Sequence, residues 1–341
     1  MLYQGRQRAA RAALAAAILL GLLQAGLAGL PAGNARAQEL KVRPLLDFSS
    51  FVFGGSAAWQ PEWAEEWSWS AAAGWGLPTH RLHYRVGAAR PLGDTGALNL
   101  YYLNWPSKLA GQSYQEGILA QAAVQPRPRD LLSLQGFAGS TVPDSGADGT
   151  PTGGGEALQV RYLQLGYKAQ LWHSPGWDGK AVAVAVLGQT PADGGAFYSL
   201  NLAVPVQRGF WYLIPRAGYS QGADHLPGFQ QYLGGYSTGW LRGYASSQFA
   251  GPALVNLTLE YRRPIPPLER TGIPVLSQLQ AGAFYDAGAI LSPGQRWSAA
   301  QWHQSYGLTL ALPVIGSLVG ADAAWNETGA LRWNLRLSGE F

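Results

Sequence analysis

Apolar and polar residues alternate along much of this chain, in segments of roughly ten residues separated by Gly, Pro, Asp and Ser. The final segment shows the pattern most clearly. One set of alternate positions holds Leu331, Trp333, Leu335, Leu337, Gly339 and Phe341, and the other holds Arg332, Asn334, Arg336, Ser338 and Glu340. A period of two predicts a β-strand with one apolar face, because a helix would mix the two sets.

The same alternation occurs in residues 81–86, 198–204 and 255–262. In the last of these, Leu257 and Leu259 oppose Thr258 and Glu260. Further strands are expected to begin near Val42, Trp67, Ala97, Gly117, Leu131, Leu158, Ala181, Phe210, Leu279, Gln304 and Leu318. These make about 15 segments, and bacterial single-chain barrels have even strand numbers. Sixteen strands are therefore expected, with fourteen as the alternative.

Two-faced strands of this kind are typical of a transmembrane β-barrel. Lipid offers no hydrogen-bond partner to the backbone, so a sheet spans a membrane only when its edges close on each other. The fold class is therefore predicted to be all-β, a transmembrane antiparallel barrel formed by residues 38–341. The strands use nearly all of that length, which leaves no room for a separate soluble domain before the barrel.

The N-terminal segment, residues 1–37, is predicted to be a secretory signal peptide. Residues 12–23 form an apolar run, which is shorter than the roughly 20 residues of a spanning helix. Residues 35–37 form a small-x-small cleavage site, which makes Gln38 the expected start of the mature chain. The positive charges around the run come from Arg6, Arg8, Arg11 and Arg36.

Charge and composition exclude several classes of function. The formal net charge is +4, and the four arginines of the predicted signal account for all of it, so the mature chain is near neutral and nucleic-acid binding has no support. Because the sequence contains no Cys, disulfides, thiolate metal sites and cysteine nucleophiles are excluded. Only 13% of the residues are charged, which is a poor profile for a cytosolic enzyme.

Two long polar loops stand out, at residues 143–155 and 221–250. The second is unusually long for a barrel and suggests a functional element, so we call it the lid loop. An interfacial aromatic girdle is expected near the first strands, and a sugar-binding platform is the alternative. The residues concerned are Trp59, Trp63, Trp67, Trp69 and Trp75.

The lid loop carries an arginine, Arg242, shortly before two strands that each place a carboxylate on their polar face. These carboxylates belong to Glu260 and Asp286, which are expected to point into the lumen. An inward-folded loop would bring Arg242 between them in a charge-assisted contact. The alternative is a solvated loop arginine above two acids that merely line a wet pore, and spacing alone leaves both open.

The order of motifs resembles the superfamily of outer-membrane insertases and two-partner transporters, which includes BamA-like and TamA-like assembly factors. The resemblance is specific from about Gly234 onward and generic before it. The motifs that carry it are Leu233-Gly234-Gly235, Arg242-Gly243-Tyr244, Glu260-Tyr261-Arg262, Phe284-Tyr285-Asp286-Ala287-Gly288 and the terminal aromatic strand. The resemblance implies a lid-loop tip at Arg242, Gly243 and Tyr244, whose arginine pairs with Asp286 and Glu260.

The resemblance also implies a role in assembly, insertion or secretion of proteins at the outer membrane. Expected partners are outer-membrane lipid, client outer-membrane or secreted proteins and periplasmic accessory proteins. Members usually carry periplasmic POTRA modules before the barrel, but strand patterns here begin within a few residues of Gln38, so none is expected. A passive pore for small solutes is the alternative, with ion preference set by Arg81, Arg85, Arg332 and Arg336.

Other motifs predict little chemistry. Residues 235–239 fit the Gly-x-Ser-x-Gly pattern around Ser237, but a hydrolase would need a strand-to-helix elbow with His and Asp partners. The five histidines have no metal-ligand spacing and are expected in loops or the girdle: His80, His83, His173, His225 and His303. No enzyme activity, metal or cofactor is expected. The terminal aromatic strand is expected to act as an assembly signal, through Trp333, Leu335, Leu337 and Phe341.

Overall fold

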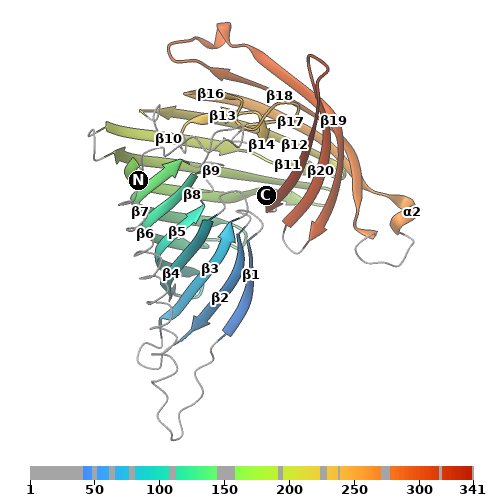
Figure 1. The fold of residues 1–341 in the computed structure, drawn as a ribbon. Helices are drawn as coiled ribbons and strands as arrows, with labels where there is room; N and C mark the ends of the chain where they lie inside the picture. The colour runs from blue at the N-terminus through green and yellow to red at the C-terminus, as the bar shows by residue number, and fades with distance from the viewer. Residues whose placement is uncertain are drawn as a thin grey trace, which may run out of the picture.

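The computed structural model describes residues 41–47, 52–60, 66–76, 81–106, 113–143, 158–190, 195–222, 229–236, 239–269, 277–314 and 317–339. One large antiparallel sheet dominates these residues and curves around an interior (Figure 1). Its strands are β1 (Lys41–Asp47), β2 (Val52–Trp59), β3 (Ser68–Gly76), β4 (Arg81–Leu92), β5 (Gly96–Pro106), β6 (Ser113–Val124), β7 (Leu131–Pro143), β8 (Leu158–Ser174), β9 (Trp177–Thr190), β10 (Gly195–Ala203), β11 (Val206–Arg208), β12 (Trp211–Gln221), β17 (Ala253–Pro264), β18 (Gln280–Leu291), β19 (Trp302–Val314), β20 (Ser317–Asn326) and β21 (Leu331–Gly339).

The seventeen strands of this sheet occupy sixteen positions around the barrel. β10 and β11 both pair with β9 on one side and with β12 on the other, so they are two pieces of one interrupted strand. With β10 and β11 counted as one strand, consecutive strands of this sheet pair antiparallel. The all-β barrel fold is confirmed, with the expected count of sixteen.

The two faces of the sheet differ as the alternation predicts. In β17, Thr258 and Glu260 are buried on the inner face, whereas Leu257 and Leu259 are more than a third exposed on the outer face. In β19, Thr309 is buried while Leu308 and Leu310 are about half exposed. Exposed leucines on a wall whose polar residues are buried indicate a surface suited to hydrocarbon.

One strand, β2, is absent from the expected set. Its central residues are Gly54, Gly55, Ser56, Ala57 and Ala58, which offer no contrast between apolar and polar side chains. These small residues let neighbouring backbones approach closely. A Cβ at Gly54 would overlap the carbonyl oxygen of Ala73 in β3. Backbone pairing and close packing therefore form this strand, and neither leaves a periodic pattern in the sequence.

The sheet is open along one edge in the part of the chain that the structure describes. β1 pairs with β2 and β21 pairs with β20, but no described residue of β1 pairs with β21. The expected closure between first and last strands is therefore not found there, and Figure 1 shows the two ends of the sheet apart. The edge strands β1 and β21 are short, with 7 and 9 residues, so few backbone hydrogen bonds could form between them.

The remaining elements are short. α2 (Pro266–Glu269) lies in the connection between β17 and β18, and a 3-10 helix (Trp297–Ala299) lies between β18 and β19. Among the described helices, none has the length and apolar character needed to span a membrane. The predicted signal peptide, residues 1–37, lies outside the described residues, as does the loop expected near 143–155 beyond Pro143.

The lid loop connects β12 to β17 and folds into a small hairpin within the curve of the sheet (Figure 1). β13 (Gln231–Leu233) pairs with β16 (Phe249–Gly251), and β14 (Gly235–Tyr236) pairs with β15 (Trp240–Leu241). Gly234 and Gly235, at the step from β13 to β14, both adopt positive φ, 127° and 55°. Other residue types rarely adopt such angles, which explains the Gly-Gly step.

Some aromatic and histidine positions differ from expectation. Trp59 pairs with Trp69 at one end of the β2–β3 hairpin, whereas Trp75 lies at the far end of β3, so these tryptophans do not form one girdle. Trp63 and the histidines at 80 and 225 lie outside the described residues. His83 and His303 were expected in loops or the girdle, but both are buried within wall strands because hydrogen bonds to Asn104 and Glu327 satisfy their rings.

Candidate functional site: the lid lock

Three residues of β18 form the wall against which the lid tip docks. Phe284, Asp286 and Gly288 alternate along the strand, so all three face the interior. The guanidinium carbon of Arg242 lies 3.3 Å from the centre of the Phe284 ring. A Cβ at Gly288 would lie 2.9 Å from Leu233 of the lid. The motif thus supplies a stacking surface, a charge and space for the lid.

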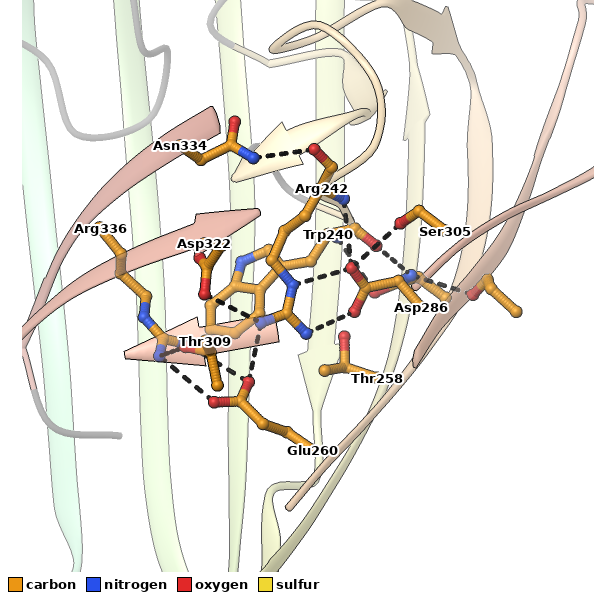
Figure 2. Close-up of polar contacts among 12 residues, drawn as sticks. Trp240, Arg242, Thr258, Glu260, Asp286, Ser305, Thr309, Asp322, Asn334 and Arg336 are labelled. Atoms are coloured by element: carbon orange, nitrogen blue, oxygen red, sulfur yellow. Dashed lines mark hydrogen bonds and ion pairs between the residues drawn. The ribbon is translucent and has the colours of Figure 1, made fainter. Parts of the chain in front are cut away.

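Arg242 is fully buried and pairs with Asp286 through three hydrogen bonds (Figure 2). Its Nε donates to Oδ2 at 2.9 Å and its Nη2 donates to Oδ1 at 2.9 Å. Its backbone N–H also donates to Oδ2, at 3.1 Å. This two-pronged contact fixes both the position and the orientation of the guanidinium.

Glu260 of β17 is shared by several arginines. Arg242 Nη1 donates to its Oε2 at 2.9 Å, and Arg336 Nη2 of β21 donates to its Oε1 at 3.3 Å. Arg262 Nε lies 2.9 Å from Oε1 in an ion pair. The buried carboxylate of Glu260 therefore links the lid tip to β21, through Arg336. It also links the lid tip to Arg262 of β17. Asp322 of β20 adds a longer ion pair, with its Oδ1 3.8 Å from Arg242 Nη1.

Polar side chains of the wall also hold the lid backbone. Asn256 Nδ2 donates to the carbonyl of Trp240 at 2.7 Å, and the Trp240 N–H donates back to Asn256 Oδ1 at 3.1 Å. Asn334 Nδ2 of β21 donates to the carbonyl of Arg242 at 2.9 Å. Ser305 Oγ donates to Asp286 at 3.3 Å and supports the main carboxylate. Residues of five strands thus contact the lid tip or its carboxylates.

Packing anchors the lid at two further places. Tyr244 is buried and lies edge-on to Phe249, with ring centres 5.3 Å apart, in a cluster with Leu241 and Leu254. On the opposite wall, Phe229 at the base of the lid lies 4.5 Å from the Phe197 ring of β10 and joins a second apolar cluster. Phe229 belongs to no pattern that the sequence made conspicuous.

The charges of the site keep Arg242 protonated. Burial by itself lowers the pKa of this guanidinium, but the charges of Asp286 and Glu260 and their hydrogen bonds raise the pKa above its ordinary value. A buried ion pair adds little net stability compared with apolar packing, yet losing one partner is costly because the other charge stays buried. The arrangement therefore specifies one docked position of the lid more than it adds overall stability.

Gly243 lies where the lid tip meets the wall, and its replacement by alanine is expected to weaken docking. A Cβ there would lie 2.8 Å from the backbone nitrogen of Asn326 and 2.8 Å from the Cβ of Ser305. Overpacking of this kind costs about 1–3 kcal/mol. Limited trypsin digestion with mass spectrometry should show faster cleavage after Arg242. Gly55→Ala, which meets nothing within 4 Å, is the matched control, and equal protection of the two variants would contradict the prediction.

The structure brings together the residues that the sequence analysis proposed for the lid: Arg242, Gly243, Tyr244, Glu260, Asp286 and Gly288. It adds others that the analysis did not select: Asn256, Ser305, Asp322, Asn334 and Arg336. The alternation of residues places Asn256 and Asn334 on the polar faces of their strands. The sequence did not indicate that both lie within hydrogen-bonding distance of the lid. Arg336, proposed as an ion-preference residue, instead binds Glu260 and is almost fully buried.

The proposed C-terminal signal is described only in part. Trp333 and Leu335 are largely exposed on the outer face of β21, at 75% and 85%. The backbone of Leu337 pairs with Val319 of β20, and Phe341 lies outside the described residues. Ser237 lies outside them too. Within the described ranges, no group of three or more His, Cys, Asp or Glu side chains is arranged to hold a metal ion.

Comparison with known proteins shows similarity at the level of fold. No protein-family model matches the sequence, and no curated protein matches it. BamA from Haemophilus ducreyi, solved without POTRA domains 1–3, aligns with a TM-score of 0.57 and 13% identity over 89% of this chain and 75% of that chain. CdiB from Acinetobacter baumannii aligns with a TM-score of 0.50 and 11% identity over 89% of this chain and 65% of that chain. Pseudomonas aeruginosa OccK11 gives a TM-score of 0.46 with 15% identity over 84% of this chain and 78% of that chain.

Proposed function

We propose that this protein is an integral outer-membrane β-barrel that acts without catalysis in the assembly, insertion or secretion of outer-membrane proteins. The observation that carries the proposal is the fully buried Arg242, held by Asp286 and Glu260 against the inner wall. These contacts hold the lid inside the barrel in one defined position, which supports a barrel whose lumen opens only when the lid is released.

The edges of the sheet support the same role. β1 and β21 do not pair with each other in the described residues, so each presents backbone groups that another strand can bind. The edge strand β21 is in direct contact with the lid lock. Asn334 binds the carbonyl of Arg242, and Arg336 binds the carboxylate of Glu260. A client strand that adds to β21 would therefore act on the lid through residues of the same strand.

The outer face of the sheet and the expected signal peptide support a location in the outer membrane. The outward leucines of β17 and β19 suit a hydrocarbon environment. Residues 1–37 would direct export and be removed, which leaves Gln38 as the mature start. Outer-membrane lipid is then one partner, and client proteins with periplasmic accessory proteins are the others. No sequence feature supports nucleic-acid binding.

Deletion of the gene is expected to lower the levels of a subset of other outer-membrane proteins, measured by quantitative mass spectrometry of isolated outer membranes. Complementation with the wild-type gene should restore those levels, and complementation with Arg242→Ala should not. Asp322→Asn serves as the matched control, because Asp322 makes only a 3.8 Å ion pair with Arg242. An unchanged outer-membrane proteome in the deletion strain would contradict the proposal.

A passive pore is the second candidate, favoured by one observation. Basic side chains line the interior near the strand ends opposite the lid loop, among them Arg129, Lys168 and Lys180. Steady conductance of the wild-type protein in planar bilayers, together with an unchanged outer-membrane proteome in the deletion strain, would favour the pore.

A further inference from the structure

A cavity of about 290 Å³ lies beneath the lid tip, inside the barrel. Its walls come from β9, β11, β12, β17, β18, β19, β20 and β21 and from Trp240 of the lid. The volume corresponds to roughly ten water molecules, so the space suits a small organic molecule. Glu260 forms one wall, which places the cavity directly against the lid lock without including Asp286.

Cations outnumber carboxylates around this cavity. Lys180, Arg262 and Arg336 line it, against Asp178 and Glu260. Arg242, which lies outside the lining, is held mainly by Asp286, whereas Glu260 of the lining contacts Arg242, Arg262 and Arg336. Asp178 pairs with Lys180 at 3.4 Å, which leaves Glu260 as the lining carboxylate that faces both Arg262 and Arg336, and Asp322 lies outside the lining. The lining therefore carries one positive charge in excess. An excess of positive charge in a partly enclosed space attracts an anion.

Arg336 provides an independent indication of a ligand. Its side chain is 3% exposed, and its Nε–H has no hydrogen-bond partner among the described residues. A buried donor without a partner is unfavourable, and most such groups in native proteins bind a protein group, water or a ligand. An anion in the adjoining cavity would supply the missing acceptor.

Apart from Gln207 and Gln280, the rest of the lining is apolar or aromatic. Its members include Trp240, Tyr212, Ile214, Pro313 and Leu318. The guanidinium of Arg262 lies 4.1 Å from the centre of the Tyr212 ring, which orients the cation beside an apolar surface. The cavity therefore combines a charged end with a body suited to a planar apolar group.

A second, wider cavity of about 610 Å³ leads to the first, because Asp178, Lys180 and Gln207 line both. It is bounded by Gly176 and Gly209, which lie in the turns at the strand ends opposite the lid loop. Arg129 and Lys168 add positive charge there. A basic entrance that narrows to a more buried basic end would guide an anion inward.

From these observations we infer that the cavity beneath the lid is a binding site for a small organic anion, a carboxylate or phosphate monoester attached to an apolar ring. Arg262 and Arg336 bind the anionic group, and Trp240 and Tyr212 contact the ring. Lys180 stands at the junction of the two cavities and attracts the anion. The site goes beyond the proposed role in protein assembly and does not depend on it.

The test uses fluorinated probes and the purified mature chain in non-ionic detergent. Fluorine NMR would measure binding of 4-fluorobenzoate, 4-fluorophenyl phosphate and the neutral 4-fluorobenzamide. At least one anion is expected to bind about tenfold more tightly than the amide, the difference that one charge-assisted hydrogen bond provides. Equal binding of the amide, or no binding of either anion, would overturn the inference. Neither result depends on client proteins, so failure here is distinct from failure of the proposed function.

Variants locate the site. Lys180→Gln and Arg262→Gln are each expected to weaken binding of the preferred anion about tenfold, as loss of one cationic contact predicts. Arg332→Gln is the matched control, because Arg332 lies on β21 with Arg336 but lines neither cavity. Heat-modifiable migration on a gel verifies that each variant is folded. Equal affinity of all three variants for the anion would place binding elsewhere and refute the site.

Discussion

Asp286→Ala is expected to release the lid tip from the barrel wall and to expose the Arg242–Gly243 peptide bond to trypsin. Three hydrogen bonds join Asp286 to Arg242, which is fully buried. Removing one partner of a buried ion pair costs about 3–5 kcal/mol, because the remaining charge loses its compensation. The lid would therefore leave the wall for water. Mass spectrometry of limited digests and planar-bilayer conductance would measure the change, and both signals should rise.

The control for this variant is Asp322→Asn. Asp322 is equally buried, but it lies 3.8 Å from Arg242 and forms no hydrogen bond with it. Its replacement should change the digestion rate and the conductance much less. If Asp286→Ala kept wild-type protection and wild-type conductance, the role of Asp286 in holding the lid would be wrong.

Glu260→Gln is expected to loosen the last strand as well as the lid. Glu260 accepts hydrogen bonds from Arg242 and Arg336 and forms an ion pair with Arg262. The amide keeps the shape but loses the charge that all three guanidinium groups share, so a loss of about 3–5 kcal/mol is expected. Hydrogen–deuterium exchange should increase in peptides of the lid tip and of β21.

The comparison variant for Glu260 is Glu116→Gln. Glu116 is a wall carboxylate whose contacts with Tyr102 and Asn104 are both 3.5 Å long, and it lies far from the lid in connectivity. Its exchange profile should stay at the wild-type level in β21. Faster exchange confined to the lid in Glu260→Gln, with β21 unchanged, would mean that Arg336 does not depend on Glu260.

The strands that the sequence predicted share one property, which is chemical contrast between their two faces. Residues 255–262 place Leu257 and Leu259 outward and Thr258 and Glu260 inward, as the alternation required. β2 lacked that contrast and escaped notice. Pairing with β1 and β3 sets the position of β2. The residues that determine this pairing therefore lie partly in other segments of the chain.

The part of the site that the sequence predicted is the part that depends only on which face of its strand each residue occupies. Asp286 and Glu260 lie on the inner faces of adjacent strands, and Arg242 lies in the loop before them, so their meeting was one of two geometric options. Arg336 and Asn334 were also known to share a face, but they lie more than 70 residues beyond Glu260 along the chain. Only the curvature of the sheet brings β21 near the lid.

By itself, the sequence determined the local pattern: a period of two, which side of each strand faces inward, and where chemistry-bearing residues fall on that side. These follow from the backbone geometry of each strand and from the insolubility of polar groups in hydrocarbon. The tertiary structure alone decided that the lid lies inside, that one carboxylate serves three arginines, and that β1 and β21 stay unpaired in the described residues. Those features depend on distances between segments far apart in the chain, and periodicity carries no information about such distances.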